Sequence, residues 1–341
     1  MNTSVDGVSK KSLANGIVSK TAVKGIGLIV AFGLLFFPIL VKYPFHRNVM
    51  IFTLLYIMLA QGWNIIGGYA GQVNLAFAVY FGIGGYTSSL LLIHANMTPW
   101  LGMVIGGVVA SIFSWILSFP LLRLRGPYFA IGTLALGFAA LVAAGKTSLI
   151  GGSIGLWLPI HSPSLYYMEW TDKTPYYYMV LVFTALTVVL IYKIDRSKLG
   201  IYLKAIKHDE EAAQALGINA AKYKTFAMVI SSFIAALGGT FFTQYLMYCN
   251  HLTVLDPLIT IKAIIITVLG GLGTVAGPII GSIILTPLSE YARAYLAGYG
   301  QAFDYIVYGF IILMVSVYNV KGLVFSINTL LRNVRSSWRL I

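Results

Sequence analysis

Charged side chains are scarce in this chain of 341 residues: Asp, Glu, Lys and Arg together make up 10% of it, whereas apolar types make up 58%. An ordinary soluble domain carries about 25% charged residues. Such a composition cannot cover the surface of a soluble fold, so lipid is the expected solvent for much of the chain. This excludes an ordinary soluble enzyme or binding domain.

Residues that hold metals or nucleotides are also few. Cys249 is the only cysteine, which excludes an internal disulfide and a cysteine-rich metal site. The five histidines are scattered, with no i, i+4 pair of the kind that favours zinc. Gly145-Lys146-Thr147 resembles the end of a phosphate-binding loop, but Ala140 stands where that motif needs a glycine. We therefore predict no metal, no cofactor and no enzymatic activity in this chain.

Only ten residues are acidic, and none falls in the middle of a predicted membrane span, Glu290 being the nearest. A charge at the bilayer centre costs at least about 2.5–3.5 kcal/mol and is normally retained for ion or proton coupling. Its absence disfavours an ion-coupled secondary transporter, which stays the alternative from another class. A membrane-embedded enzyme would need a convergent nucleophile, base or metal set, which we do not find.

Long apolar runs dominate what is present. Each is roughly 20 residues long, which matches a helix that crosses a hydrocarbon core of about 30 Å, whereas barrel strands would alternate over about ten residues. We predict an all-α, polytopic integral membrane protein of about ten transmembrane helices. The predicted spans are 25–43, 48–66, 76–95, 100–119, 127–149, 176–194, 225–248, 260–272, 277–297 and 303–320.

The net charge of +13 comes from basic residues that lie between the spans rather than in one patch, so we predict no nucleic-acid partner. Most of them fall in segments that share one side of the membrane, which places both termini in the cytoplasm by the positive-inside rule. The predicted organisation is a cytoplasmic tail at 1–24, one transmembrane domain at 25–320 with a cytoplasmic loop at 195–224, and a basic amphipathic tail at 321–341. The last tail has the pattern of a helix on anionic lipid.

Two glycine-dense segments, 67–74 and 270–278, interrupt the helices at membrane depth. Backbone groups freed in this way are tolerated only where protein or a water-filled cavity satisfies them. Paired breaks in two halves point to a translocation site, and tight turns with close helix packing are an equally open interpretation. The predicted pathway residues, whose side chains or backbone could instead tie helices together, are Gln61, Asn64, Gln72, Asn74, Gly273 and Thr274.

The loop at 195–224 contains a predicted short helix with its own start and stop signals. Asp209 suits the N-cap, and Gly217 suits the position after the last turn. Small apolar residues fall on one face, so the helix fits a groove in another protein better than a surface of anionic lipid, which its acidic residues would repel. The predicted docking residues are Asp209, Glu210, Glu211, Ala212, Ala213, Ala215, Leu216 and Gly217.

These residues carry a resemblance to a known family. Glu211-Ala212-Ala213 followed by Gly217 resembles the loop motif with which importer-type ABC permeases contact their ATPases, although the usual downstream Ile-x-Leu-Pro is missing. Over roughly residues 45–325, an ordered set of motifs is similar to the branched-chain amino-acid permeases, most closely their M-type subunits. These motifs are Trp63-Asn64-Ile65, Gly68-Tyr69-Ala70-Gly71-Gln72, Arg123 to Ala130, Leu269 to Thr274 and Gly277-Pro278.

The resemblance implies a permease subunit of an ABC importer that moves branched-chain amino acids across a bacterial cytoplasmic membrane. It also implies partners: a second homologous permease, two cytoplasmic ATPases that bind ATP and Mg²⁺, an extracytoplasmic substrate-binding protein and membrane lipid. Helix 209–217 would then couple ATP hydrolysis to transport. Permeases for urea and short-chain amides share these motifs, so they stay the alternative for the substrate.

Overall fold

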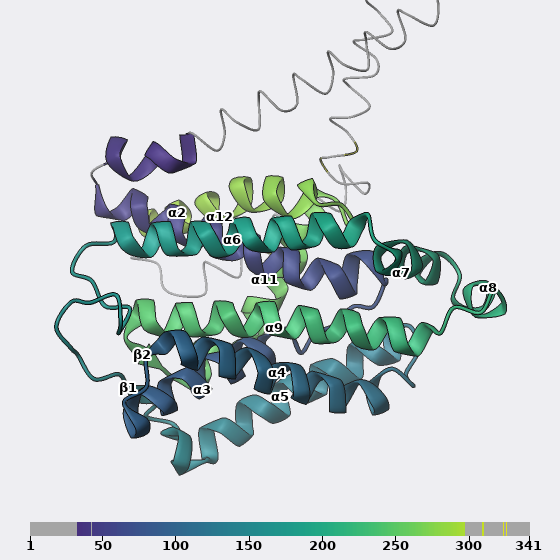
Figure 1. The fold of residues 1–341 in the computed structure, drawn as a ribbon, viewed down its shortest axis with the longest axis horizontal. Coiled ribbons are helices and arrows are strands. Elements are labelled where there is room, and N and C mark those ends of the chain that lie inside the picture. The colour runs from purple at the N-terminus through teal and green to yellow at the C-terminus, as the bar shows by residue number, and fades with distance from the viewer. Residues whose placement is uncertain (1–32, 42, 297–308, 310–322, 324, 326–341) are drawn as a thin grey trace, which may run out of the picture. The chain divides into compact units, whose positions relative to one another are not determined.

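A computed structural model describes residues 33–41, 43–296, 309, 323 and 325, and the described chain is helical almost throughout (Figure 1). The chain divides into two units, residues 1–47 and 48–341, and the description below concerns the second. Nearly half of the first predicted span lies outside the described residues, as do nearly all of the tenth span and of the C-terminal tail and the whole of the N-terminal tail. The number of ten spans and the cytoplasmic position of the termini therefore stay predictions.

The described helices follow the predicted series of apolar spans closely. They are α2 (Pro44–Asn64), continued by a π-helix η1 (Ile65–Tyr69), α3 (Phe77–Ala95), α4 (Pro99–Leu121), α5 (Pro127–Lys146), α6 (Thr174–Asp195), α7 (Lys198–His208), α8 (Glu210–Ala215), α9 (Ala220–Leu246), α10 (His251–Val254), α11 (Pro257–Gly270) and α12 (Ala276–Leu296). A 3₁₀ turn, η2 (Ser148–Ile150), and two short strands, β1 (Leu156–Trp157) and β2 (Tyr248–Cys249), lie between them, and residues 33–40 before α2 are also helical. Proline in the first turn starts α4, α5, α6 and α11, where its missing N–H costs nothing.

Seven of the described helical stretches are long and apolar enough to cross a membrane, by length and composition alone. They coincide with the second to eighth predicted spans. The eighth is longer than predicted, because α10 and α11 together extend it from His251 to Gly270. The ninth predicted span corresponds to α12, which is long enough but carries Glu290 and Arg293 and is not one of the seven.

Helices α3, α4 and α9 pack with their backbones in close contact. A Cβ atom on Gly84 of α3 would lie 2.1 Å from the Ala236 carbonyl oxygen of α9, and one on Gly239 would lie 1.8 Å from the Phe81 carbonyl oxygen. The Thr240 hydroxyl donates to the Gly84 carbonyl at 3.0 Å. Small residues at such crossings allow the van der Waals and hydrogen-bond contacts that hold helices together in lipid. These three helices therefore form a tight group.

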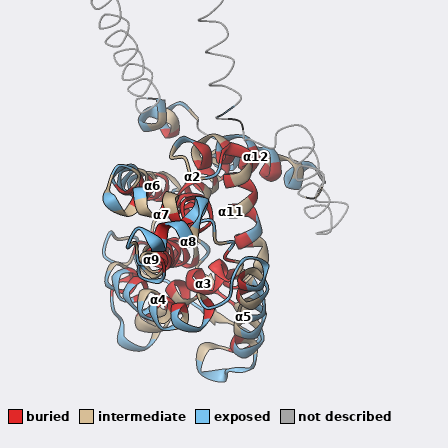
Figure 2. Ribbon diagram, turned by 90° about the vertical axis from the view of Figure 1, so that its right-hand side faces the viewer, coloured by how far each residue is buried: buried red, intermediate tan, exposed pale blue. Residues whose placement is uncertain are grey.

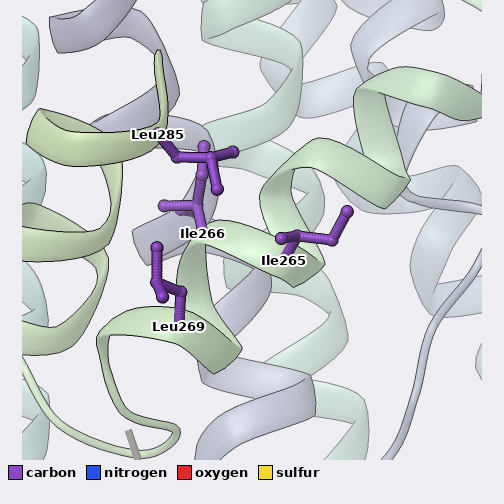
Figure 3. Packing of buried hydrophobic residues seen from close by; sticks show 5 residues of the cluster. Ile265, Ile266, Leu269 and Leu285 are labelled. Atoms are coloured by element: carbon purple, nitrogen blue, oxygen red, sulfur yellow. The ribbon is translucent and has the colours of Figure 1, made fainter. Parts of the chain in front are cut away.

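A second packing centre joins α11 and α12 to α2. Its buried members are Ala60, Ile265, Ile266, Leu269 and Leu285, and Figure 3 shows the α11 side chains beside Leu285 of α12. Glycine brings α11 and α12 into contact here too, since a Cβ atom on Gly281 would lie 2.0 Å from the Ile266 carbonyl oxygen, and the branched chains fill the space beside that contact. Two packing centres thus divide the described helices, one around α9 and one around α11.

The outward faces of several helices are apolar. On α5 the buried residues are Phe129, Thr133 and Ala144, whereas Ile131 is 63% exposed and Val142 is 54% exposed. Figure 2 shows the largely exposed surface of this helix. An apolar helix face of this size, which none of the described residues cover, is matched by the hydrocarbon of a bilayer.

The two strands fasten a loop to the far end of α9. β1 pairs antiparallel with β2, with Leu156 opposite Cys249. The Leu158 N–H also donates to the Met247 carbonyl at 3.2 Å. The loop that follows α5 is therefore fixed to the end of α9 that lies away from α8.

Candidate functional site

The first glycine-rich segment begins inside a π-helix. Within η1, the Ala70 N–H donates to the Ile65 carbonyl at 3.3 Å, which is the i→i+5 pattern of such a turn. The Trp63 ring covers Gly67, where a Cβ atom would lie 2.2 Å from the ring, and its Nε1 donates to the Asn74 carbonyl at 2.8 Å. Single π-turns within helices are frequent at functional sites. Here the turn folds the chain back onto the end of α2.

Two carboxamides on α2 join this segment to the second one. The Asn64 Oδ1 accepts from the Gly273 N–H at 2.9 Å, and its Nδ2 donates to the Thr274 carbonyl at 3.0 Å. One turn earlier, the Gln61 Nε2 donates to the Val275 carbonyl at 2.6 Å. We call residues 67–74 and 270–277 together the glycine junction. Its two segments touch, since a Cβ atom on Gly68 would lie 2.6 Å from the Gly273 nitrogen.

The second segment also closes on itself. The Thr274 hydroxyl donates to the Gly271 carbonyl at 2.9 Å and accepts from the Gly277 N–H at 3.0 Å. Gly271 has φ 134° and Gly273 has φ 74°, which are conformations that residues with a Cβ atom rarely adopt. These two glycines are required by the backbone of the turn.

The structure thus brings the six predicted pathway residues to one place. Gln61, Asn64 and Asn74 are fully buried, whereas Gln72, Gly273 and Thr274 are half-buried. The Gln61 Oε1 and the Asn74 Nδ2 have no hydrogen-bond partner within the described part of the chain. Helix-joining contacts are therefore present at four of these positions, and their role in a pathway stays a prediction.

The glycine junction lies at the ends of two membrane-capable helical stretches, and its depth in the membrane stays a prediction. Gly68 stands at the end of the span formed by α2 and η1, and Gly270 ends the span formed by α10 and α11. From α7, the Lys207 Nζ donates to the Gly68 carbonyl at 2.8 Å, and the Lys204 Nζ lies 5.2 Å from the centre of the Tyr69 ring. Burial lowers the pKa of Lys207. The junction therefore contacts the loop that carries α7 and α8.

The predicted short helix is confirmed, together with its caps. The Asp209 Oδ1 accepts from the backbone N–H three residues later at 2.9 Å. At the other end, Gly217 has φ 84°, its N–H donates to the Gln214 carbonyl at 2.9 Å, and the Ile218 N–H donates to the Ala213 carbonyl at 3.1 Å. This pair of bonds is the Schellman arrangement that ends a helix at glycine.

One face of α8 is held and the other is open. Ala213 is buried and packs with Ile206 of α7 and Ala220 of α9. Ala212 and Ala215 are exposed, and Leu216 is 83% exposed. The predicted apolar face of this helix therefore points away from the described part of the chain.

Ion pairs hold α8 in place. The Glu210 carboxylate lies 2.6 Å from the Nζ of Lys224, whose side chain is 5% exposed, in the first turns of α9. Glu211 pairs with Arg125 at 3.3 Å, and both are so exposed that the pair contributes little. Removing Glu210 would leave a buried ammonium without a partner, which costs about 3–5 kcal/mol. The Glu210–Lys224 pair therefore makes α8 and α9 one unit.

Lys207 and Lys224 were not among the residues predicted for the site. The former contacts a carbonyl 139 residues away, and the latter looked like one of many basic loop residues. Among the described residues, no three His, Cys, Asp or Glu side chains gather closely enough to hold a metal ion.

Residues 46–316 match the family described as branched-chain amino acid transport system, permease component. The chain belongs to this permease family. With its seven membrane-capable helices, it is a multi-pass membrane protein and an ABC-type permease. The resemblance drawn from the motifs around Asn64 and Gly273 is confirmed.

Individual relatives have only moderate identity to this permease. The high-affinity branched-chain amino acid transport system permease protein LivM of Escherichia coli K12 is 27% identical over 80% of this chain and 68% of its own length. The high-affinity branched-chain amino acid transport system permease protein LivH of Salmonella typhimurium is 26% identical over 71% of this chain and 83% of its own length. The nucleoside ABC transporter permease protein NupC of Lactococcus lactis is 24% identical over 58% of this chain and 66% of its own length. No solved structure matches this chain.

The carboxamide of Asn64 is testable as the bond between the two halves of the glycine junction. In Asn64→Leu, the N–H of Gly273 and the carbonyl of Thr274 lose their partners, at a cost of about 1–3 kcal/mol each. We expect backbone amides 271–276 to exchange with deuterium roughly tenfold faster or more. Ser231→Ala is the control, because the buried Ser231 hydroxyl has no hydrogen-bond partner among the described residues. Unchanged exchange at 271–276 in Asn64→Leu would show that the bond does not hold the junction.

Proposed function

We propose that this permease forms one half of the membrane domain of an ABC importer that takes up branched-chain amino acids. A second, homologous permease forms the other half, two cytoplasmic ATPases bind ATP and Mg²⁺, and an extracytoplasmic binding protein delivers the substrate. The description of the family and the names of LivM and LivH support the substrate class. Similarity to both proteins supports pairing of two related permeases.

The proposed location is a bacterial cytoplasmic membrane, with about ten spans and both termini in the cytoplasm. The basic residues of the segment 193–224, which includes α7 and α8, support a cytoplasmic position for that loop under the positive-inside rule. In this orientation the exposed face of α8 points toward soluble ATPases.

The proposed mechanism uses α8 as the coupling helix. Closure of the ATPases on ATP moves the exposed face of α8, and the Glu210–Lys224 pair passes the movement to α9. The Lys207–Gly68 bond passes it through α7 to the glycine junction. The unpartnered Gln61 Oε1 and Asn74 Nδ2 supply hydrogen-bonding capacity for a second arrangement of the junction or for a polar solute. The observation that supports this proposal most directly is the placement of α8. One face of this short helix is exposed and apolar, and its opposite face packs against α7 and α9, the helices of the two routes.

One experiment tests both the composition of the transport complex and its substrate. The tagged chain, purified in mild detergent from its native membrane, should bring with it a second permease and two ATPases. Liposomes that contain this complex and the binding protein should take up leucine when ATP is present. Isoleucine and valine should compete with leucine, whereas urea, a short-chain amide and a nucleoside should not. Leucine uptake by the chain alone, driven by an ion gradient, would instead establish a secondary transporter.

The docking role of α8 is tested by Leu216→Asp, alone or with Ala212→Asp. A carboxylate on the open face cannot be buried in an apolar groove, so we expect loss of co-purified ATPases and at least tenfold slower ATP-driven uptake, for a cost of about 1.4 kcal/mol or more. Leu149→Asp is the matched control, because Leu149 in η2 is also 83% exposed. Retention of the ATPases and normal uptake in Leu216→Asp would remove α8 from the coupling route.

The link from α7 to the glycine junction is tested by Lys207→Met, which keeps the length of the side chain and removes the donor. A hydrogen bond from a charged donor contributes about 1.5–3 kcal/mol, so transport per ATP hydrolysed should fall by about tenfold or more while the ATPases stay bound. Lys198→Met, at the exposed start of α7, should leave the ratio unchanged. An unaltered ratio in Lys207→Met would mean that the movement bypasses this bond.

A further inference from the structure

A groove of about 670 Å³ lies between α4 and the first half of α9. Its walls are apolar and exposed: Ile112 is 52%, Trp115 is 51% and Phe119 is 59% exposed on α4, and Phe226 is 48% exposed on α9. Along its floor the two helices are tied by the Ser118 and Thr225 hydroxyls at 3.1 Å. The floor is therefore closed by the packing of α4 on α9, and the mouth faces outward.

The end of the groove nearest α8 is positively charged. Arg123, just after α4, and Lys222, in the first turn of α9, both line it, and no acidic residue does. Both are exposed, and neither has an ion pair within the described residues, whereas the nearby Lys224 and Arg125 are paired with Glu210 and Glu211. The N-terminus of α9 adds the positive end of a 27-residue helix.

The dimensions of the groove match one leaflet of a bilayer. From Leu122 to Ser111 the groove follows α4 over eleven residues, or about 16 Å at 1.5 Å per residue. Half of the hydrocarbon core is about 15 Å thick. The cationic end therefore falls at the level of headgroups when the apolar walls lie among the acyl chains. A basic pocket between helices at this level is suited to an anionic headgroup.

We propose that this groove is a binding site for one anionic phospholipid. The phosphate lies between Arg123 and Lys222, and an acyl chain lies along Trp115, Phe119 and Phe226. A neutral zwitterionic lipid fits the apolar walls equally well, so the two basic residues supply the preference. Each basic side chain near the membrane surface favours an anionic lipid by a factor of about five, which gives a total preference of roughly ten- to thirtyfold.

Trp115 reports occupancy of the site directly. The full-length chain is reconstituted in phosphatidylcholine vesicles with increasing fractions of phosphatidylglycerol or phosphatidylcholine brominated on the acyl chains, because bromine quenches tryptophan fluorescence on contact. The Trp115 signal is the difference between the unaltered chain and Trp115→Phe, which removes one of six tryptophans. The remaining tryptophans show that both proteins are inserted.

Half-quenching of Trp115 should occur at a roughly ten- to thirtyfold lower fraction of brominated phosphatidylglycerol than of brominated phosphatidylcholine. Arg123→Gln with Lys222→Gln should abolish this preference. Lys193→Gln with Lys198→Gln, an equal change of charge at exposed residues outside the groove, should keep it. Equal quenching by both lipids in the unaltered chain, a preference that survives Arg123→Gln with Lys222→Gln, or no quenching by either lipid would each overturn the proposal. The last result would mean that protein covers the groove.

Discussion

The arrangement around the glycine junction depends on one side chain that satisfies two backbone groups at once. Backbone N–H and C=O groups that leave a helix near lipid must find partners within the protein. Asn64 offers an acceptor and a donor on one planar group, and these meet the Gly273 N–H and the Thr274 carbonyl. Gln61, one turn away on the same face of α2, does the same for the next carbonyl. The two carboxamides thus supply the hydrogen bonds that a further turn of helix would have made between α11 and α12. The two bonds of Asn64 join residues that are 209 and 210 positions apart in the sequence.

Close contact between backbones makes this arrangement possible. Gly68 and Gly273 meet at a distance that leaves no room for a Cβ atom. The same principle brings α3 and α9 together at Gly84 and Gly239. It also brings α11 and α12 together, since a Cβ atom on Gly281 would lie 2.0 Å from the Ile266 carbonyl oxygen, and branched side chains pack beside that contact. Glycine therefore marks the helix pairs whose backbones touch directly.

Features determined by neighbouring residues could be predicted from the sequence. Spans two to eight follow from apolar runs of membrane length, and the caps of α8 follow from Asp209 and Gly217, because a cap is made within four residues. The glycine-rich segments were found for the same reason. The family could be named before the structure because its motifs are an ordered set.

Features determined by distant residues could not be predicted. Nothing near Lys207 in the sequence indicates that its ammonium reaches Gly68, and the carboxamides of Gln61 and Asn64 could be assigned equally to a pathway or to helix contacts. The contact between the two glycine-rich segments depends on η1, which continues the helix to Tyr69, beyond the end of the predicted span, and on the Trp63 ring, which covers Gly67. Residue type gives the capacity to bond, whereas only the packing of α2, α7 and α11 selects the partner.

The strand pair β1–β2 gives α9 an unequal freedom of movement at its two ends. The strands and the Leu158–Met247 bond anchor the helix at its carboxyl end, and α8 is fixed to its amino end through Lys224. A helix of 27 residues is about 40 Å long. If it pivots about the anchored end, a tilt of about 5° displaces the amino end by about 3.5 Å over that length. A small rotation of α9 about the strands is then enlarged along the helix, so Lys224, near the amino end, moves much farther than residues near the strands.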